Sequence, residues 1–200
     1  MGDHYYNEKP TVESDRKKIT ETIAGETLHF TVDSGVFSKK GIDYGSKLLV
    51  ESFQFHGLEG SLCDVGCGWG PIGLTLAKKY PSKKVSMIDI NERAVELTKL
   101  NAQRNNINNV SVFQNDLLKG QKEESFAVIL TNPPIRAGKE VIFHLYEQAF
   151  RCLKPDGELW IVIQKKQGAP STINKLETIG LDTEIVKKSK GYFILKGKKC

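Results

Sequence analysis

The sequence predicts an α/β fold built on one doubly wound, mostly parallel sheet of seven strands with helices on both faces. Short apolar runs alternate with segments of helical spacing along most of the chain. These runs are nearly continuously apolar, as in strands that are buried on both faces of a sheet. The last two runs are separated only by a short turn at Gly191, which permits only antiparallel pairing. We therefore expect the sheet to end in an antiparallel hairpin.

The composition indicates one domain of ordinary polarity. The chain has 200 residues, of which 39% are hydrophobic and 26% charged, enough for a sizeable core. We expect a single domain at 1–200, with an N-terminal extension at 1–43 and the core at 44–200. Because no apolar run approaches the ~18 to 20 residues of a membrane span and the start lacks a signal-peptide pattern, we expect a cytoplasmic protein without a membrane partner.

Cysteine and lysine give weaker indications. The four cysteines show no pair at metal-ligand spacing, so we expect reduced thiols and no metal site. The formal net charge is +5, and lysines cluster near the C-terminus. Such a cluster is consistent with a polyanionic partner such as RNA and equally with a solvated surface. Charge alone therefore leaves the partner open.

Local signals place the elements in order. A hairpin at 18–32 is predicted by alternation around a glycine turn, and helical spacing begins at Tyr44 after a loop. Pro71 opens one helix, Asn91 is a suitable N-cap for another, and apolar residues from Ile142 onward share one helix face. The predicted helices are 44–55, 71–80, 92–105, 139–153 and 171–179. The predicted strands of the main sheet are 61–64, 84–89, 110–114, 126–131, 158–163, 183–187 and 192–195.

A glycine-rich stretch after the first of these strands indicates a ligand site. It reads Asp64-Val65-Gly66-Cys67-Gly68-Trp69-Gly70-Pro71. Glycine permits positive φ angles and a close approach of ligand to backbone, and the start of a helix offers unpaired N–H groups. We therefore expect a small charged cofactor here. The residues expected to contact it are Asp64, Gly66, Cys67, Gly68 and Gly70.

Two cofactor classes fit these glycines. Gly68-x-Gly70-x-x-Gly73 matches the dinucleotide fingerprint, whereas Asp64-x-Gly66-x-Gly68-x-Gly70 looks like motif I of S-adenosylmethionine-dependent methyltransferases. A carboxylate at Asp64 would repel a pyrophosphate, but it suits a ligand that carries an ammonium and a sulfonium. Charge complementarity therefore favours S-adenosylmethionine over a nicotinamide dinucleotide.

Polar residues at the ends of the next two strands complete the predicted cofactor site. Asp89, followed by Ile90, is placed to accept hydrogen bonds from two ribose hydroxyls. Asn115 and Asp116 follow the third strand, from where a side chain accepts a hydrogen bond from an adenine amino group. The alternatives are a solvated strand-end acid for Asp89 and an Asx turn for the Asn-Asp pair.

The segment Asn132-Pro133-Pro134-Ile135 indicates the acceptor side of the reaction. Its prolines fix φ and remove two N–H donors, so it presents only backbone carbonyls beside the Asn132 side chain. An amino group bound by the Asn132 side-chain oxygen and the Pro133 carbonyl would be oriented for methyl transfer. The segment resembles the Asn/Asp-Pro-Pro-aromatic motif of methyltransferases that act on planar amino groups, with Ile135 in place of the aromatic residue. A plain Asn-Pro-Pro turn is the alternative.

Several stretches together resemble the catalytic domain of the RsmC family, whose members methylate guanine N2 of small-subunit (16S) ribosomal RNA. The resemblance implies a class I, Rossmann-like methyltransferase fold with S-adenosylmethionine as cofactor. It places Asn132, Pro133, Pro134 and Ile135 at the catalytic site. Asn132 is also expected to contact the cofactor. The stretches are His4-Tyr5-Tyr6, Gly35-Val36-Phe37-Ser38-Lys39-Lys40, Asp64 to Gly73, Asn91-Glu92-Arg93-Ala94, Asn132 to Lys139 and Gln164-Lys165-Lys166-Gln167-Gly168-Ala169.

The resemblance also implies ribosomal RNA or the small ribosomal subunit as partner. Arg136, Lys139, Lys165 and Lys166 would then contact RNA phosphates around the acceptor pocket, with plain surface charges as the alternative. Two-domain members carry an upstream degenerate copy of the fold, and this chain resembles the single-domain members. Whether it acts as a monomer or a homodimer stays open.

Three other functions stay open at this point. A protein glutamine or DNA adenine methyltransferase would use the same chemistry, although Ile135 departs from the adenine-type motif. A nicotinamide-dependent oxidoreductase would use Gly68-x-Gly70-x-x-Gly73. A non-catalytic RNA-binding module would keep the fold without the reaction.

Overall fold

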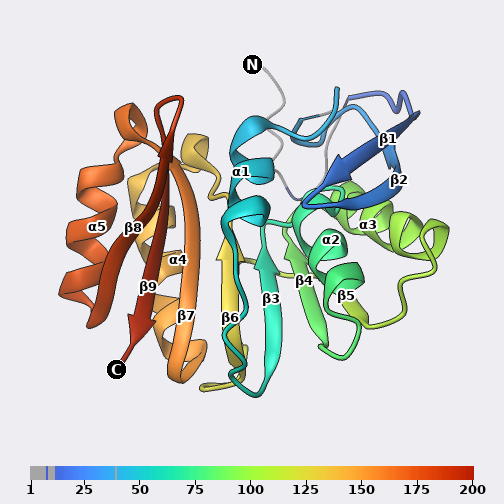
Figure 1. Ribbon diagram of the computed structural model, residues 1–200. Coiled ribbons are helices and arrows are strands. Elements are labelled where there is room, and N and C mark those ends of the chain that lie inside the picture. Colours follow the sequence, from blue (N-terminus) through green and yellow to red (C-terminus); the bar gives the residue numbers. More distant parts are fainter. Residues whose placement is uncertain (1–7, 9–11, 39) are drawn as a thin grey trace.

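The computed structural model describes residues 8, 12–38 and 40–200 (Figure 1). Its main sheet contains β3 (Ser61–Val65), β4 (Val85–Asp89), β5 (Val110–Gln114), β6 (Phe126–Thr131), β7 (Leu153–Gln164), β8 (Leu181–Ser189) and β9 (Tyr192–Lys199). The strand order is β5-β4-β3-β6-β7-β9-β8. The strands from β5 to β7 are parallel, and β9 pairs antiparallel with both β7 and β8. The predicted seven-stranded sheet with an antiparallel end hairpin is confirmed.

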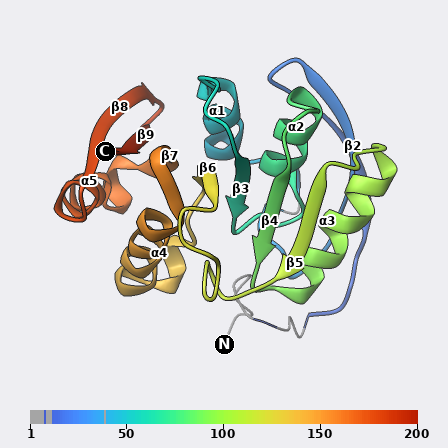
Figure 2. The ribbon, with the colours of Figure 1, turned by 90° about the horizontal axis from the view of Figure 1, so that it is seen from below.

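Helices cover both faces of this sheet, as Figure 2 shows from below. One apolar cluster packs α1 (Tyr44–Ser52), α2 (Pro71–Lys79) and α3 (Glu92–Arg104) on one face. A second cluster packs α4 (Lys139–Cys152) and α5 (Ala169–Thr178) on the other. Successive strand residues alternate between the two clusters, as Leu62 and Cys63 of β3 do. The central strands β3 and β6 are thus buried on both sides, which explains their nearly continuous apolar sequence.

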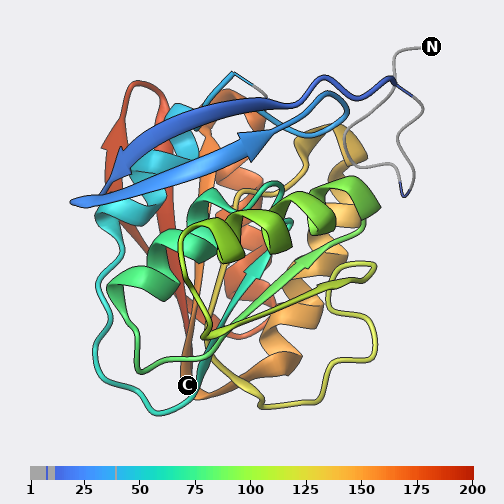
Figure 3. The ribbon, with the colours of Figure 1, turned by 90° about the vertical axis from the view of Figure 1, so that its right-hand side faces the viewer.

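The N-terminal extension forms the predicted hairpin of β1 (Lys17–Ile23) and β2 (Glu26–Val32). Its two turn residues, Ala24 and Gly25, both have positive φ, as a two-residue type I′ turn requires. Figure 3 shows the hairpin lying along α3. The Asn101 amide of α3 donates to the Thr31 carbonyl and accepts from the Thr31 N–H, and Asn105 does the same with His29. The edge of β2 is therefore hydrogen-bonded by two asparagine side chains instead of a third strand.

Several element boundaries differ from the sequence expectation, and the largest differences are at the end of α1, the start of β7 and the end of β9, which reaches Lys199 instead of 195. α1 ends at Ser52 instead of 55, because Phe53 turns extended and packs edge-on against Trp160, with 5.2 Å between the ring centroids. β7 begins at Leu153 instead of 158, since Leu153 already pairs with Phe126 before the register shifts. A positive φ at Asp156 accompanies that irregularity.

The structure was also searched for membrane-spanning helices and for groups of metal ligands. Within residues 8, 12–38 and 40–200, no helix is long and apolar enough to cross a membrane. Over the same residues, no group of three or more His, Cys, Asp and Glu side chains is placed to hold a metal ion. Cys63, Cys67 and Cys152 are buried free thiols and Cys200 is exposed.

Candidate active site

A cavity of about 260 Å³ opens at the carboxyl ends of β3, β4, β5 and β6. The chain passes from β3 to β4 and β5 on one side and then returns to β6 on the other, so the cavity lies at the topological switch point of the sheet. Thr131 at the end of β6 pairs with Val65 at the end of β3, and its hydroxyl donates to the Val65 carbonyl at 2.8 Å. This pairing brings the glycine stretch and the Asn-Pro-Pro segment to one edge.

The glycine loop has the backbone conformation that its sequence predicts. Gly66, Gly68 and Gly70 have φ angles of 75°, 57° and 97°. A Cβ at Gly66 or Gly68 would meet no atom within 4 Å, so both backbones border open space. A Cβ at Gly73 would instead lie 2.6 Å from Met87 Cε. The third glycine of the dinucleotide fingerprint therefore serves the close packing of α2 on β4.

Asp64 lies beneath the loop and does not line the cavity. Its Oδ2 accepts a hydrogen bond from the Gly73 N–H at 2.8 Å, which fixes the first turn of α2. Its Oδ1 is buried without a hydrogen-bond partner among the described residues. Desolvation by burial, opposed by the hydrogen bond from the Gly73 N–H and assisted by the nearby charge of Asp89, raises the pKa of Asp64 to about 7. A positive charge above the loop would stabilise the ionised form.

Asp89 lines the cavity and ties the loop to β4. Its Oδ2 accepts from the Gly68 N–H at 2.8 Å, and its Oδ1 accepts from the Asn91 N–H at 2.9 Å. Desolvation raises the pKa of Asp89 to about 6, although these hydrogen bonds oppose the rise. Ile90 follows it in the cavity wall. Asp89 is thus positioned by backbone N–H groups on both sides.

The β5 end of the cavity is formed by Asn115, Asp116 and Leu117. The Asn115 amide nitrogen donates to the Leu117 and Lys119 carbonyls at 3.1 and 3.0 Å, so Asn115 holds this turn together. Asp116 is exposed on it. Leu117 has a positive φ of 50° and supplies an apolar wall that no sequence signal predicts.

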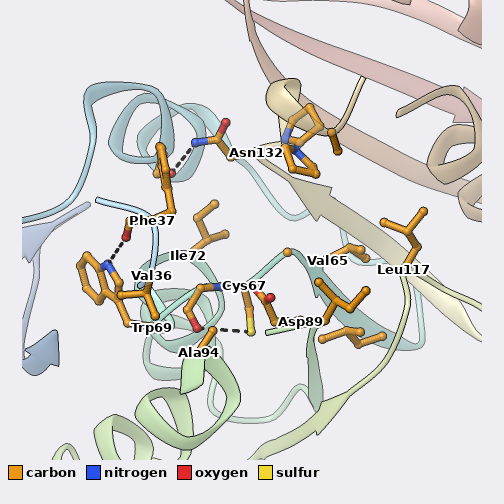
Figure 4. A pocket seen from close by; sticks show the side chains of 18 of the residues that line it. Val36, Phe37, Val65, Cys67, Trp69, Ile72, Asp89, Ala94, Leu117 and Asn132 are labelled. Carbon is orange, nitrogen blue, oxygen red and sulfur yellow. Dashed lines mark hydrogen bonds between the residues drawn. The ribbon is translucent and has the colours of Figure 1, made fainter. Parts of the chain in front are cut away.

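The N-terminal extension supplies another wall through Val36 and Phe37 (Figure 4). The buried Trp69 of the glycine loop donates its indole N–H to the Phe37 carbonyl at 3.0 Å. The Asn91 amide donates to the Gly35 carbonyl at 2.9 Å. The loop at 35–41 is therefore part of the site, while Lys39 within it and the His4-Tyr5-Tyr6 stretch lie outside the described residues.

The acceptor side contains Asn132, Pro133 and Pro134, and Figure 4 shows Asn132 across the cavity from Asp89. The Asn132 amide nitrogen donates to Ser46 Oγ at 2.9 Å and lies 3.3 and 3.4 Å from the two carboxylate oxygens of Asp43. Because a carboxylate only accepts, the amide nitrogen has to face Asp43. The Asn132 side-chain oxygen therefore points away from this pair, and no described residue donates to it.

Asp43 and Ser46 are site residues that the sequence reasoning missed. Both line the cavity. Asp43 is the N-cap of α1, with Oδ1 accepting from the Ser46 N–H at 3.1 Å. The available signal was an aspartate just before a helix-spaced segment, which predicts a cap. Nothing in the local sequence places that cap beside Asn132, 89 positions away.

Other predicted site residues lie outside the cavity wall. Ile135, in the 3₁₀ helix η1 (Ile135–Ala137), packs against the apolar cluster of α4 and α5 instead of lining the cavity. Arg136, Lys139, Lys165 and Lys166 are exposed and also do not line it. They follow β6 and β7, which are neighbours in the sheet, so they lie along the edge that carries the cavity.

The charge of the cavity wall discriminates between the two cofactor classes. Asp43, Asp89 and Asp116 line it, and no lysine or arginine does among the residues that the structure describes. Such a wall attracts a cationic ligand and repels a pyrophosphate. The open glycine backbones and this charge fit S-adenosylmethionine. The fold and the site together define a class I methyltransferase.

Residues 27–196 match the model of the methyltransferase small domain family, and the chain belongs to that family. A curated relative from Bacillus subtilis (strain 168), the uncharacterized protein YbxB, is 52% identical over 200 residues, 100% of this chain and 100% of the relative. The cofactor is accordingly S-adenosylmethionine, and the nicotinamide-dependent oxidoreductase alternative is excluded.

Solved structures show the same fold. The T. thermophilus 16S rRNA N2 methyltransferase RsmC, in complex with AdoMet and guanosine, matches with a TM-score of 0.83 and 24% identity over 96% of this chain and 52% of that chain. This chain thus spans about half the length of that protein. A methyltransferase from Pyrococcus furiosus matches with a TM-score of 0.64 and 25% identity over 76% and 80% of the two chains. The expected RsmC-like class I fold is confirmed.

Proposed function

We propose that this methyltransferase modifies an exocyclic amino group, namely guanine N2 of small-subunit ribosomal RNA. The observation that carries the proposal is the fixed orientation of Asn132, whose amide nitrogen is bound by Ser46 and Asp43. Asn132 and Pro133 both line the cavity, and we propose that the Asn132 side-chain oxygen and the Pro133 carbonyl act there as a pair of acceptors. A planar amino group has two N–H donors, which match this pair.

The acceptor pair would act on the nitrogen in two ways. Two hydrogen bonds orient the amino group, and they draw its protons so that electron density rises on nitrogen. When bound, S-adenosylmethionine would supply an electrophilic methyl group on a sulfonium, and these two acceptors would hold the amino nitrogen ready to take it. The methylated nitrogen then releases its extra proton to water, so a strong general base is unnecessary.

The remaining cavity residues would hold the cofactor. We propose that the backbone of Gly66, Cys67 and Gly68 contacts its methionine part, with the negative charge of Asp64 beneath. Gly70, also expected at the cofactor, does not line the cavity and is the N-cap residue of α2. Asp89 would accept from the ribose hydroxyls, since each carboxylate oxygen that binds one backbone N–H can accept a second hydrogen bond. Asp116 and the Asn115 turn would border the adenine.

The exposed basic residues support an RNA substrate. Arg136 and Lys139 follow β6, and Lys165 and Lys166 follow β7, at the edge that carries the cavity. We propose that they contact phosphates around the target nucleotide, as lysine and arginine commonly do. The RsmC neighbour in complex with guanosine agrees with this choice of base. A cytoplasmic location and a ribosomal partner follow from the proposal.

A direct assay tests the substrate. Small ribosomal subunits and their naked RNA, taken from cells that lack this protein, are incubated with the enzyme and isotope-labelled S-adenosylmethionine. Nucleoside mass spectrometry should find N2-methylguanosine in the RNA. Label in N6-methyladenosine or in a protein glutamine would contradict the proposal, and so would the absence of label from both the RNA and the protein. Mapping the modified guanine would identify the target nucleotide.

A further inference from the structure

Asp43 places a carboxylate directly beside the proposed acceptor residue. It lines the same cavity as Asn132 and Pro133 and is half-buried there. Its Oδ1 accepts from the Ser46 N–H at 3.1 Å and from the Asn132 amide at 3.3 Å. Its Oδ2 makes one long contact, 3.4 Å to the same amide. Oδ2 therefore retains the capacity to accept a further hydrogen bond from a ligand in the cavity.

The edges of the purine bases differ at the atom next to the amino group. Guanine carries N1–H beside its N2 amino group, so two neighbouring groups donate hydrogen bonds. Adenine carries an unprotonated N1 beside its N6 amino group, and the lone pair of that nitrogen would face a carboxylate. A site that pairs an amide oxygen with a carboxylate thus suits guanine. It rejects adenine, because the carboxylate oxygen and adenine N1 are both acceptors and neither finds a hydrogen-bond donor.

We propose that Asp43 is the specificity-determining residue of the site and accepts a hydrogen bond from N1–H of the target guanine, while Asn132 and Pro133 bind the N2 amino group. The proposal rests on the proposed function above. Ile135 lies outside the cavity, and stacking is tolerant of base identity, so neither explains how one base is selected. The base is then selected by hydrogen bonds along its edge.

The substitution Asp43→Asn separates base reading from the structural role of this residue. Asparagine caps helices about as well as aspartate, and its oxygen can keep the contacts with the Ser46 N–H and the Asn132 amide. Its amide nitrogen then replaces Oδ2 and donates where the carboxylate accepted. Glu51→Gln is the matched control, because it removes the same charge from an exposed position on α1.

The test uses RNA of the mapped site in which the target base is guanine, 6-thioguanine or 2-aminopurine. All three carry the 2-amino group, and only 2-aminopurine lacks N1–H. The wild type should use 6-thioguanine about 10-fold or more better than 2-aminopurine, as measured by kcat/KM. Asp43→Asn should lose about 10-fold or more on guanine and should abolish or invert the preference over 2-aminopurine. Glu51→Gln should keep the wild-type rates and the wild-type preference.

Separate outcomes overturn the two proposals. If wild type uses 6-thioguanine and 2-aminopurine equally well, Asp43 does not read N1–H, even though N2 methylation stands. The same conclusion follows if Asp43→Asn lowers all three rates by one common factor. Equal use of the two bases by the wild type overturns the proposal even if the variant fails to fold, as its thermal melting curve would show. If wild type methylates no guanine of the RNA, the proposed function itself is wrong.

Discussion

The two sides of the cavity are constructed in different ways. On the cofactor side, the backbone of Gly66 and Gly68 forms the wall, and Asp89 is held by backbone N–H groups of that loop and of the next turn. On the acceptor side, Asn132 is held by the side chains of Asp43 and Ser46, from a helix 86 and 89 positions away. The first side depends on local backbone conformation and the second on long-range side-chain contacts. Substitutions should therefore separate cofactor binding from turnover.

The largest effect is expected for Asn132→Ala on the acceptor side. Turnover should fall by ~10² to 10³-fold, as for the loss of one preorganised polar contact in a transition state. Affinity for S-adenosylhomocysteine, measured by calorimetry, should change little. Asn174→Ala, on the exposed part of α5, is the control. A variant that methylates at the wild-type rate would remove Asn132 from the acceptor site.

The next effect is expected for Asp89→Ala on the cofactor side. Cofactor affinity should weaken by ~1.5 to 3 kcal/mol, the range for hydrogen bonds to a charged group. The Gly68 and Asn91 N–H groups also lose their partner, so part of the loss reflects the loop itself. Asp182→Ala, exposed on β8, should leave the affinity unchanged. Unaltered calorimetric binding by Asp89→Ala would rule out the ribose role.

A pH effect on stability is expected from Asp64. Its pKa is about 7 in the folded chain, above the ordinary 3.8, so folding favours its protonated form. The contribution of this protonation to the free energy of unfolding is fully present below about pH 4 and is lost as the pH rises through 7. Between pH 5 and pH 7 the wild type should lose about 1 to 2 kcal/mol relative to Asp64→Asn, measured by urea unfolding without cofactor. Parallel pH profiles for the two proteins would show that Asp64 has an ordinary pKa.

The smallest effect is expected for Ser46→Ala. It removes the 2.9 Å hydrogen bond to the Asn132 amide and leaves Asp43 in place. One such bond contributes ~0.5 to 1.5 kcal/mol, which corresponds to a ~2- to 10-fold loss of turnover at unchanged cofactor affinity. Ser52→Ala on the same helix is a matched control, because the buried Ser52 hydroxyl has no hydrogen-bond partner among the described residues. An equal loss in both variants would indicate a general effect of α1 packing.

The cofactor side could be predicted in detail because its signals are contiguous. Gly66, Gly68 and Gly70 adopt the positive φ angles that their spacing implies, and Asp89 lines the cavity at the end of the next strand. Asp64 belongs to the same motif, yet it lies beneath the loop and contacts Gly73. The acidic residue was found from the sequence, whereas its burial depends on how α2 packs on the sheet.

The acceptor side could be predicted only in part. Asn132 and the prolines were found because they follow a buried strand directly. Asp43 was missed because an N-cap aspartate has the same local pattern whatever lies opposite it. The motif predicts Ile135 at the catalytic site, whereas in η1 it is half-buried and packs against the apolar cluster of α4 and α5.

The sequence by itself determined the fold class, the glycine loop and the acceptor segment, because alternating apolar runs, glycine spacing and paired prolines act over a few residues. The tertiary structure decided which side chains meet. Only the pairing of β3 with β6 and the packing of α1 bring Asp43 and Ser46 to Asn132. Such contacts depend on the positions of whole elements, and no local pattern encodes them.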